Sequence, residues 1–211
     1  MTPLAPFSSP GLAELHAAAA GAGLTVLSSA SWPETDADGE VTALAGFIES
    51  NFSPLLAEVA GRALRRRAQP QATGQVIAVV MVTALGDVTS ATRVAAAVDA
   101  GQRVFPLLFF QSVPNAVAGY LAARWQLTGP VVCVSGTAAG LDVAALLIDD
   151  ADADEALVVR ADLAVTDGDR DRGAAILVTG SPGRVPVRND AAGPHEPEGE
   201  GSDEHPRHRP H

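Results

Sequence analysis

Lysine is absent from this sequence, and all 14 basic residues are arginines. A chain without lysine has no amine nucleophile, no Schiff-base lysine and no phosphate-loop lysine, so enzyme classes that depend on such a group are excluded. The arginines are also too few to balance the 25 acidic residues, which leaves a net charge of −11. This charge argues against nucleic acids and anionic membranes as partners.

Cysteine, aromatic residues and long apolar runs are scarce as well. Cys133 is the single cysteine, so the chain cannot form an internal disulfide or a multi-cysteine zinc or iron–sulfur site. Aromatic residues make up 4% of the chain, so its core must consist largely of Ala, Val and Leu. No apolar run approaches the roughly 18 residues of a membrane span, and no Lys or Arg precedes the Ala-rich residues 17–22. We therefore expect a cytoplasmic protein, and the sequence predicts neither a cofactor nor a metal site.

The composition changes abruptly after Pro182 and divides the chain into three parts. Residues 183–211 contain Pro, Gly, His, Arg and acidic residues with almost nothing to bury, which predicts a disordered tail. Four of the five histidines lie there, but their spacing fits no rigid coordination set, so we favour a solvated tail over a metal site. Residues 1–10 are predicted to be flexible, and residues 11–182 to form one domain.

Between these ends, segments typical of strands alternate with segments typical of helices. Strands are predicted over residues 24–29, 75–83, 130–135, 156–161 and 173–179, and helices over residues 12–22, 53–67, 89–100, 112–125 and 138–149. The strand segments are mostly continuous apolar runs, such as QVIAVVMVT at 75–83, and such runs indicate strands covered on both faces. The alternation predicts an α/β fold with a layered sheet.

The helix predicted over residues 138–149 is unusually apolar. Its residues 138–148, AAGLDVAALLI, contain Asp142 as their one charged residue. A helix that is apolar on every side is expected to be buried on every side. This pattern predicts a central helical layer between two sheets.

A specific resemblance begins in residues 104–130, where an aromatic-rich loop leads to Ser112-Val113-Pro114-Asn115 at the start of a helix. Gly129-Pro130 then precedes a strand, a turn of small residues and the apolar helix. In this order, over roughly residues 41–179, the sequence resembles the N-terminal half of a β-ketoacyl synthase of the thiolase-like superfamily. The resemblance implies a layered αβαβα sandwich made of two similar halves, of which this chain contains the first, with a buried central helix.

The catalytic position of that family departs from its pattern here. In the condensing enzymes a cysteine at the N-terminus of the buried helix carries the acyl chain, and this position falls on Thr137, or on Ala138 if an apparent deletion lies later. Cys133 lies earlier, within the predicted strand, where a buried thiol is usually inert. A threonine hydroxyl needs a neighbouring base, and no histidine lies between His16 and His195. The family's second half, which carries its catalytic histidines, has no counterpart here, so we predict no catalysis by this chain alone.

The resemblance also assigns a role to one loop. In ketosynthases this loop lies at the dimer interface and shapes the acyl tunnel of the neighbouring subunit. The residues at these positions are Phe105, Phe109, Phe110, Gln111, Ser112, Val113, Pro114 and Asn115. The favoured hypothesis is a non-catalytic subunit similar to the chain-length factors of type II polyketide synthases. It would pair with a full-length ketosynthase and meet the acyl carrier protein only indirectly.

Two alternatives stay open, and two charged runs allow more than one interpretation. The chain could be a structural or regulatory binding module without influence on acyl chains, or, least favoured, an acyltransferase that uses Thr137. Residues 65–67 are three arginines that suit a helix C-terminus, or that could dock an acidic carrier protein. Residues 149–155 contain five acidic residues and are interpreted as a solvated loop.

Overall fold

The computed structural model describes residues 10–35, 37–104, 106–111, 113–164 and 169–182. The flexible N-terminus and the tail expected from the sequence lie, apart from Pro10, outside the described residues. The elements, in chain order, are α1 (Pro10–Gly21), β1 (Leu24–Trp32), α2 (Phe52–Arg65), β2 (Ile77–Val82), α3 (Val88–Asp99), α4 (Pro106–Gln111), α5 (Asn115–Trp125), β3 (Val131–Val134), α6 (Thr137–Asp149), β4 (Glu155–Asp162) and β5 (Arg172–Gly180).

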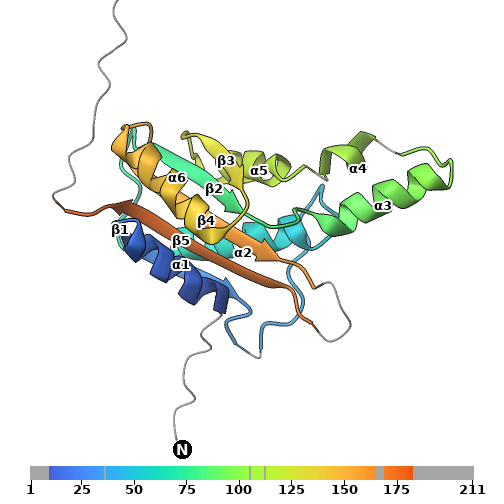
Figure 1. The fold of residues 1–211 in the computed structure, drawn as a ribbon, viewed down its shortest axis with the longest axis horizontal. Helices are drawn as coiled ribbons and strands as arrows, with labels where there is room; N and C mark the ends of the chain where they lie inside the picture. Colours follow the sequence, from blue (N-terminus) through green and yellow to red (C-terminus); the bar gives the residue numbers. More distant parts are fainter. Residues whose placement is uncertain (1–9, 36, 105, 112, 165–168, 183–211) are drawn as a thin grey trace, which may run out of the picture.

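The described strands form one mixed five-stranded sheet in the order β1-β5-β4-β2-β3 (Figure 1). The pairs β4–β2 and β2–β3 are parallel, whereas β1–β5 and β5–β4 are antiparallel. All of β2 and most of β4 and β5 are buried, as the continuous apolar runs predict. Helices cover both faces of these central strands, which explains why their residues do not alternate between apolar and polar.

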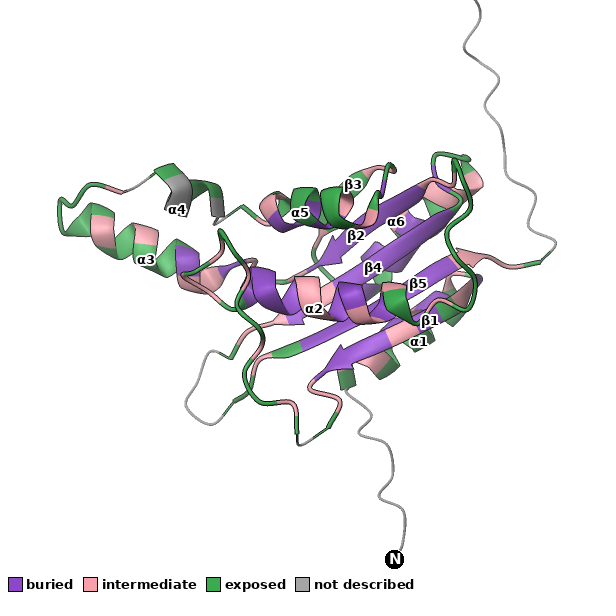
Figure 2. Ribbon diagram, turned by 180° about the vertical axis from the view of Figure 1, so that it is seen from behind, coloured by how far each residue is buried: buried purple, intermediate pink, exposed green. Residues whose placement is uncertain are grey.

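Each face of the sheet carries its own apolar cluster. Leu157 and Val159 of β4 belong to the cluster beneath α2 and α5, and Ala156 and Val158 belong to the cluster beneath α1 and α6. Figure 2 shows α2 and α5 on the near face of the sheet. Successive side chains of the strand point to opposite faces of the sheet, so a single apolar run contributes to the apolar clusters on both faces.

Two predictions about burial need correction. β3 is an edge strand whose Val131 and Cys133 are exposed, whereas a buried strand is expected from its sequence. α6 packs Gly140 and Leu141 against the sheet, but Leu146 on its opposite side is 57% exposed. The reason is the same in both cases, because the described sheet ends at β3 and covers only one side of α6.

The run of acidic residues from 149 to 155 does not lie wholly in a solvated loop, since its last member begins β4. Glu155 is buried and accepts hydrogen bonds from Arg67 (2.6 Å) and Gln75 (2.8 Å) on the same oxygen, Oε1. Burial raises the pKa of Glu155 despite the neighbouring guanidinium. The carboxylate thus ties the end of α2 to the start of the central strand.

A helical arm made of α3 and α4 extends away from the sheet (Figure 1). Asp87 caps α3 by accepting hydrogen bonds from the backbone N–H and the hydroxyl of Ser90, and Gly101 follows the helix with φ +64°, as its predicted role at the C-terminus requires. The helix predicted from residue 112 begins at Asn115 instead, because the preceding residues form the separate short helix α4.

Candidate functional site

The two positions that the sequence resemblance assigns to a nucleophile, Thr137 and Ala138, begin α6 directly after the turn that follows β3. Gly136 adopts φ +97°, a conformation that favours glycine, and Thr137 begins the helix directly after it. A Cβ atom on Gly140 would lie 2.5 Å from Cγ2 of Val82, so the missing side chain lets α6 approach β2 closely. The helix therefore begins at the carboxyl ends of β2 and β3, the edge where open α/β sheets place their ligands.

The hydroxyl of Thr137 is hydrogen-bonded to an arginine. Thr137 is 5% exposed, and its Oγ1 accepts a hydrogen bond from Nη1 of Arg160 at 3.0 Å. Arg160 reaches this point from β4 and also forms ion pairs with Glu14 of α1 and with Asp162. The guanidinium therefore links α1, β4 and the N-terminus of α6.

The carboxylate beside the Thr137 hydroxyl is a weak base. A threonine nucleophile must transfer its proton to a base, and Glu14 is the carboxylate hydrogen-bonded to Thr137. The hydrogen bonds from Thr137 and Arg160 lower the pKa of Glu14, which makes its carboxylate a weaker base. The alternative position, Ala138, carries no functional group, and His16 is the one histidine among the described residues.

The surroundings of Cys133 do not activate its thiol. The residue lies on β3 and is exposed, although the sequence predicts a buried thiol. Partial burial of the sulfur nevertheless raises its pKa, so the thiol stays protonated at neutral pH. A raised thiol pKa is the opposite of what a catalytic cysteine requires.

The predicted interface residues lie on the helical arm and at its junction with α5. Phe109 and Phe110 of α4 are 64% and 62% exposed, and Val113 is exposed as well. Pro114 is the N-cap of α5 and Asn115 its first residue. Phe105 and Ser112 lie outside the described residues, and Gln111 is the last residue of α4.

The exposed apolar residues of the arm extend beyond those predicted. Leu85 before α3 and Val98 on α3 are also largely exposed, and Figure 2 shows most of α3 in the colour of exposed residues. Arg93 of α3 forms an ion pair with Glu49, which anchors the arm to the loop before α2. Exposed apolar residues that lie together are typical of surfaces that contact other molecules.

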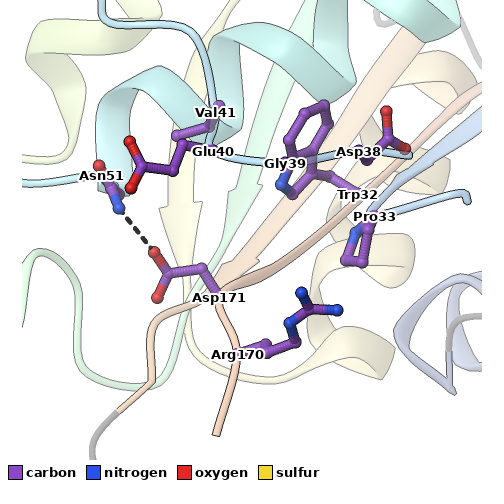
Figure 3. Close-up of a pocket in the computed structure, with 9 residues that line it drawn as sticks. All are labelled: Trp32, Pro33, Asp38, Gly39, Glu40, Val41, Asn51, Arg170 and Asp171. Carbon is purple, nitrogen blue, oxygen red and sulfur yellow. Dashed lines mark hydrogen bonds between the residues drawn. The ribbon is translucent and has the colours of Figure 1, made fainter. Parts of the chain in front are cut away.

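A cavity of about 390 Å³ lies elsewhere, where the loop after β1 meets the start of β5 (Figure 3). Its lining comprises Trp32, Pro33, Asp38, Gly39, Glu40, Val41, Asn51, Arg170 and Asp171. Arg62 stacks on the Trp32 ring at 4.5 Å and is hydrogen-bonded to Asp38, while Asn51 donates a hydrogen bond to Asp171 at 2.9 Å. These carboxylates are therefore already committed to structural contacts.

Sequence reasoning did not identify this cavity, and none of the predicted site residues lines it. The signal available was a tryptophan followed by the acidic residues of the loop after it, which by itself indicates no chemistry. Among the described residues, no three His, Cys, Asp or Glu side chains are grouped so as to hold a metal ion. No helix in the described ranges is both long and apolar enough to cross a membrane.

No protein-family model matches this chain, and no curated protein matches it in sequence. Solved structures do match. A chain in the complex of the ketosynthase ApeO with its chain length factor ApeC from Xenorhabdus doucetiae aligns with a TM-score of 0.59 and 17% identity, over 76% of this chain and 80% of that one. A chain of the ishigamide ketosynthase/chain length factor aligns with a TM-score of 0.55 and 20% identity, over 71% of this chain and 49% of that one.

At these identities the similarity concerns the fold. This chain therefore has the thiolase-like α/β fold of the ketosynthases, as the sequence resemblance predicts. The matched part corresponds to about half of the ishigamide chain but to most of the matched chain in the Xenorhabdus doucetiae complex.

Proposed function

We propose that this chain is a non-catalytic, ketosynthase-like subunit that pairs with a full-length ketosynthase in the cytoplasm. In this role it shapes the acyl tunnel of its partner during polyketide or fatty-acid-like chain elongation, as a chain-length factor does. The observation that carries the proposal is the Thr137 position, to which the sequence resemblance assigns the nucleophile and where this chain has a hydroxyl that is hydrogen-bonded to Arg160. Condensation then requires a partner that supplies the cysteine and the histidines.

The surface of the described domain supports the pairing. The arm exposes Phe109 and Phe110, and β3, an edge strand of the described sheet, exposes Val131. Apolar patches and open sheet edges both favour association with another chain. The matched chain in the Xenorhabdus doucetiae complex supports it further, because a chain of similar size there belongs to a ketosynthase and chain length factor pair.

A role in setting chain length assigns the two phenylalanines to the end of the partner's tunnel. Replacing a ring by a methyl group would open space there. Each methylene group that enters this space would gain about 0.8 kcal/mol, enough to shift the product distribution several-fold toward longer chains.

The test is reconstitution with the partner ketosynthase and acyl carrier protein, with product length read by mass spectrometry. Phe109→Ala and Phe110→Ala are expected to lengthen the products at similar total turnover. Val98→Ala, which also removes an exposed apolar side chain from the arm, is the matched control and should leave the length unchanged.

Two outcomes point elsewhere. Unchanged product lengths with an intact complex would favour the alternative of a purely structural or regulatory binding module. Failure of the chain to form any complex on co-expression, together with a monodisperse monomer that unfolds cooperatively, would contradict the pairing itself.

A further inference from the structure

Two arginines at the ends of α2 and α5 differ from most others in the described domain. Carboxylates pair with the arginines at positions 62, 66, 67, 93 and 160. Arg65 and Arg124 have no ion pair within the described residues, and both instead flank the ring of Trp125. Their guanidinium carbons lie 6.0 and 5.9 Å from its centroid. We infer that Arg65, Trp125 and Arg124 form a docking site for an acidic segment of another protein.

The structure separates the three consecutive arginines that the sequence presents as one run. Arg66 is bound to Glu34 by two hydrogen bonds, and Arg67 is paired with the buried Glu155. These two side chains are therefore committed to the fold. Arg65 is exposed and lies against Trp125, so the run contributes one guanidinium to the surface.

A buried glycine makes room for this pairing. Gly61 lies within α2, where glycine is less favourable than alanine because it loses more backbone entropy. A Cβ atom at this position would lie 3.1 Å from Nη1 of Arg65 and 3.5 Å from Cζ2 of Trp125. The preference of helix C-termini for basic residues explains the arginines themselves, but it does not explain this space between the two helices.

Two open hollows adjoin the Trp125 ring, and Arg65 and Trp125 line both of them. One, of about 360 Å³, is lined also by Gln69 and Gln71, and the other, of about 230 Å³, also by Tyr120. The only carboxylate among their described lining residues is Glu58, which is already paired with Arg62 at 2.8 Å. Arg65, Trp125 and Arg124 thus form a cationic ridge beside two hollows, and this arrangement fits a segment that lays successive side chains across the ridge, rather than a single small ion.

The chemistry of the ridge selects the occupant. A guanidinium forms paired hydrogen bonds with a carboxylate in its own plane, and two of them beside an indole can hold two acidic side chains of one segment. Nucleic acids and anionic membranes present dense negative charge to the whole molecule, and its net charge of −11 repels them. A protein segment can bring a few carboxylates to this ridge alone. The site is independent of the tunnel role proposed above.

The experiment measures binding of a fluorescein-labelled peptide of alternating Glu and Ala residues to the full chain by fluorescence anisotropy. Arg65→Gln and Arg124→Gln are each expected to weaken binding about fivefold at low ionic strength. Arg103→Gln removes one positive charge from another exposed arginine without an ion pair among the described residues, and it is the matched control. Thermal unfolding of each variant verifies that the fold is retained.

Further readouts separate a built site from general attraction. Gly61→Ala should weaken binding although it replaces neither arginine, because the new Cβ atom would displace the Arg65 side chain. Binding should also change the fluorescence emission of Trp125, one of two tryptophans in the chain. The inference is overturned if the peptide does not bind, if Arg103→Gln weakens binding as much as Arg65→Gln, or if single-stranded DNA or anionic lipid vesicles bind the same residues more tightly than the peptide.

Discussion

Substitution of Gly140 by alanine is expected to destabilise the domain, because α6 lies against β2 without space for a side chain. The new Cβ atom would lie 2.5 Å from Cγ2 of Val82, closer than carbon atoms approach in folded proteins. Val82 is buried and β-branched, so its methyl group cannot turn away freely. Overpacking of this kind costs about 1–3 kcal/mol, and the better helix propensity of alanine returns up to about 1 kcal/mol. The expected net loss is about 1–2 kcal/mol.

Gly119 provides the matched control. It also lies within a helix, α5, but a Cβ atom there would meet nothing within 4 Å. Gly119→Ala should therefore raise the free energy of unfolding by up to about 1 kcal/mol. Urea unfolding of the full chain, followed by circular dichroism, measures both variants under the same conditions.

A double variant shows where the strain arises. Val82→Ala removes the methyl group that the new Cβ atom would meet, so Gly140→Ala should cost less in that background than in the parent. If Gly140→Ala and Gly119→Ala stabilise the chain equally, α6 does not lie this close to β2, and the account of the turn at Thr137 fails with it.

Two further predictions concern chemistry and charge. The purified chain, incubated with malonyl-carrier protein and an acyl thioester, should show no acyl adduct by intact mass spectrometry, because Arg160 holds the Thr137 hydroxyl and Glu14 is a weak base; an adduct mapped to Thr137 would refute this. Hydrogen bonds from Arg62 lower the pKa of Asp38 from 3.8 to about 2, so the stability that this carboxylate contributes is present above about pH 4 and is lost as the pH falls toward 2. Asp38→Asn should therefore cost about 1 kcal/mol at neutral pH and almost nothing near pH 2, as measured by urea midpoints across that range; a pH-independent difference would contradict the ion pair.

The order of the strands and helices could be predicted from the sequence because the central strands are buried on both faces. The runs at β2 and β4 contain few polar residues, and continuous β-branched segments of this length have few other stable conformations. The fold class followed from their alternation with helices. The turn between β3 and α6 could be expected from its small residues, because Gly136 has a positive φ and Gly140 lies close to β2. The assignment of a nucleophile to Thr137 or Ala138 stays a prediction from the resemblance.

Burial of the outer elements could not be predicted in the same way. An apolar side chain favours burial, but the sequence does not show whether another segment of the same chain packs over it. Leu146 of α6 and Val131 of β3 are apolar and exposed, because no further described strand or helix lies over them. The ion-pair partners of individual charged residues could not be predicted either. Glu155 and Arg67 are far apart in sequence and meet only because β4 lies beside the end of α2.

The absence of catalysis that we propose for this chain rests on more than one residue. A nucleophile at a helix N-terminus gains from the positive end of the helix dipole only if a substrate can reach it and a base can accept its proton. Here the same guanidinium that donates a hydrogen bond to Thr137 also binds Glu14 and Asp162, so Arg160 links α1 to the sheet and to the start of α6. These charged groups contact one another within the domain. The unsatisfied surface then lies elsewhere, on the arm and on the edge strand, where Phe109, Phe110 and Val131 are exposed. The chemistry of the buried turn and the distribution of exposed apolar residues thus favour the same role, that of a subunit whose contribution is made through its contacts with another chain.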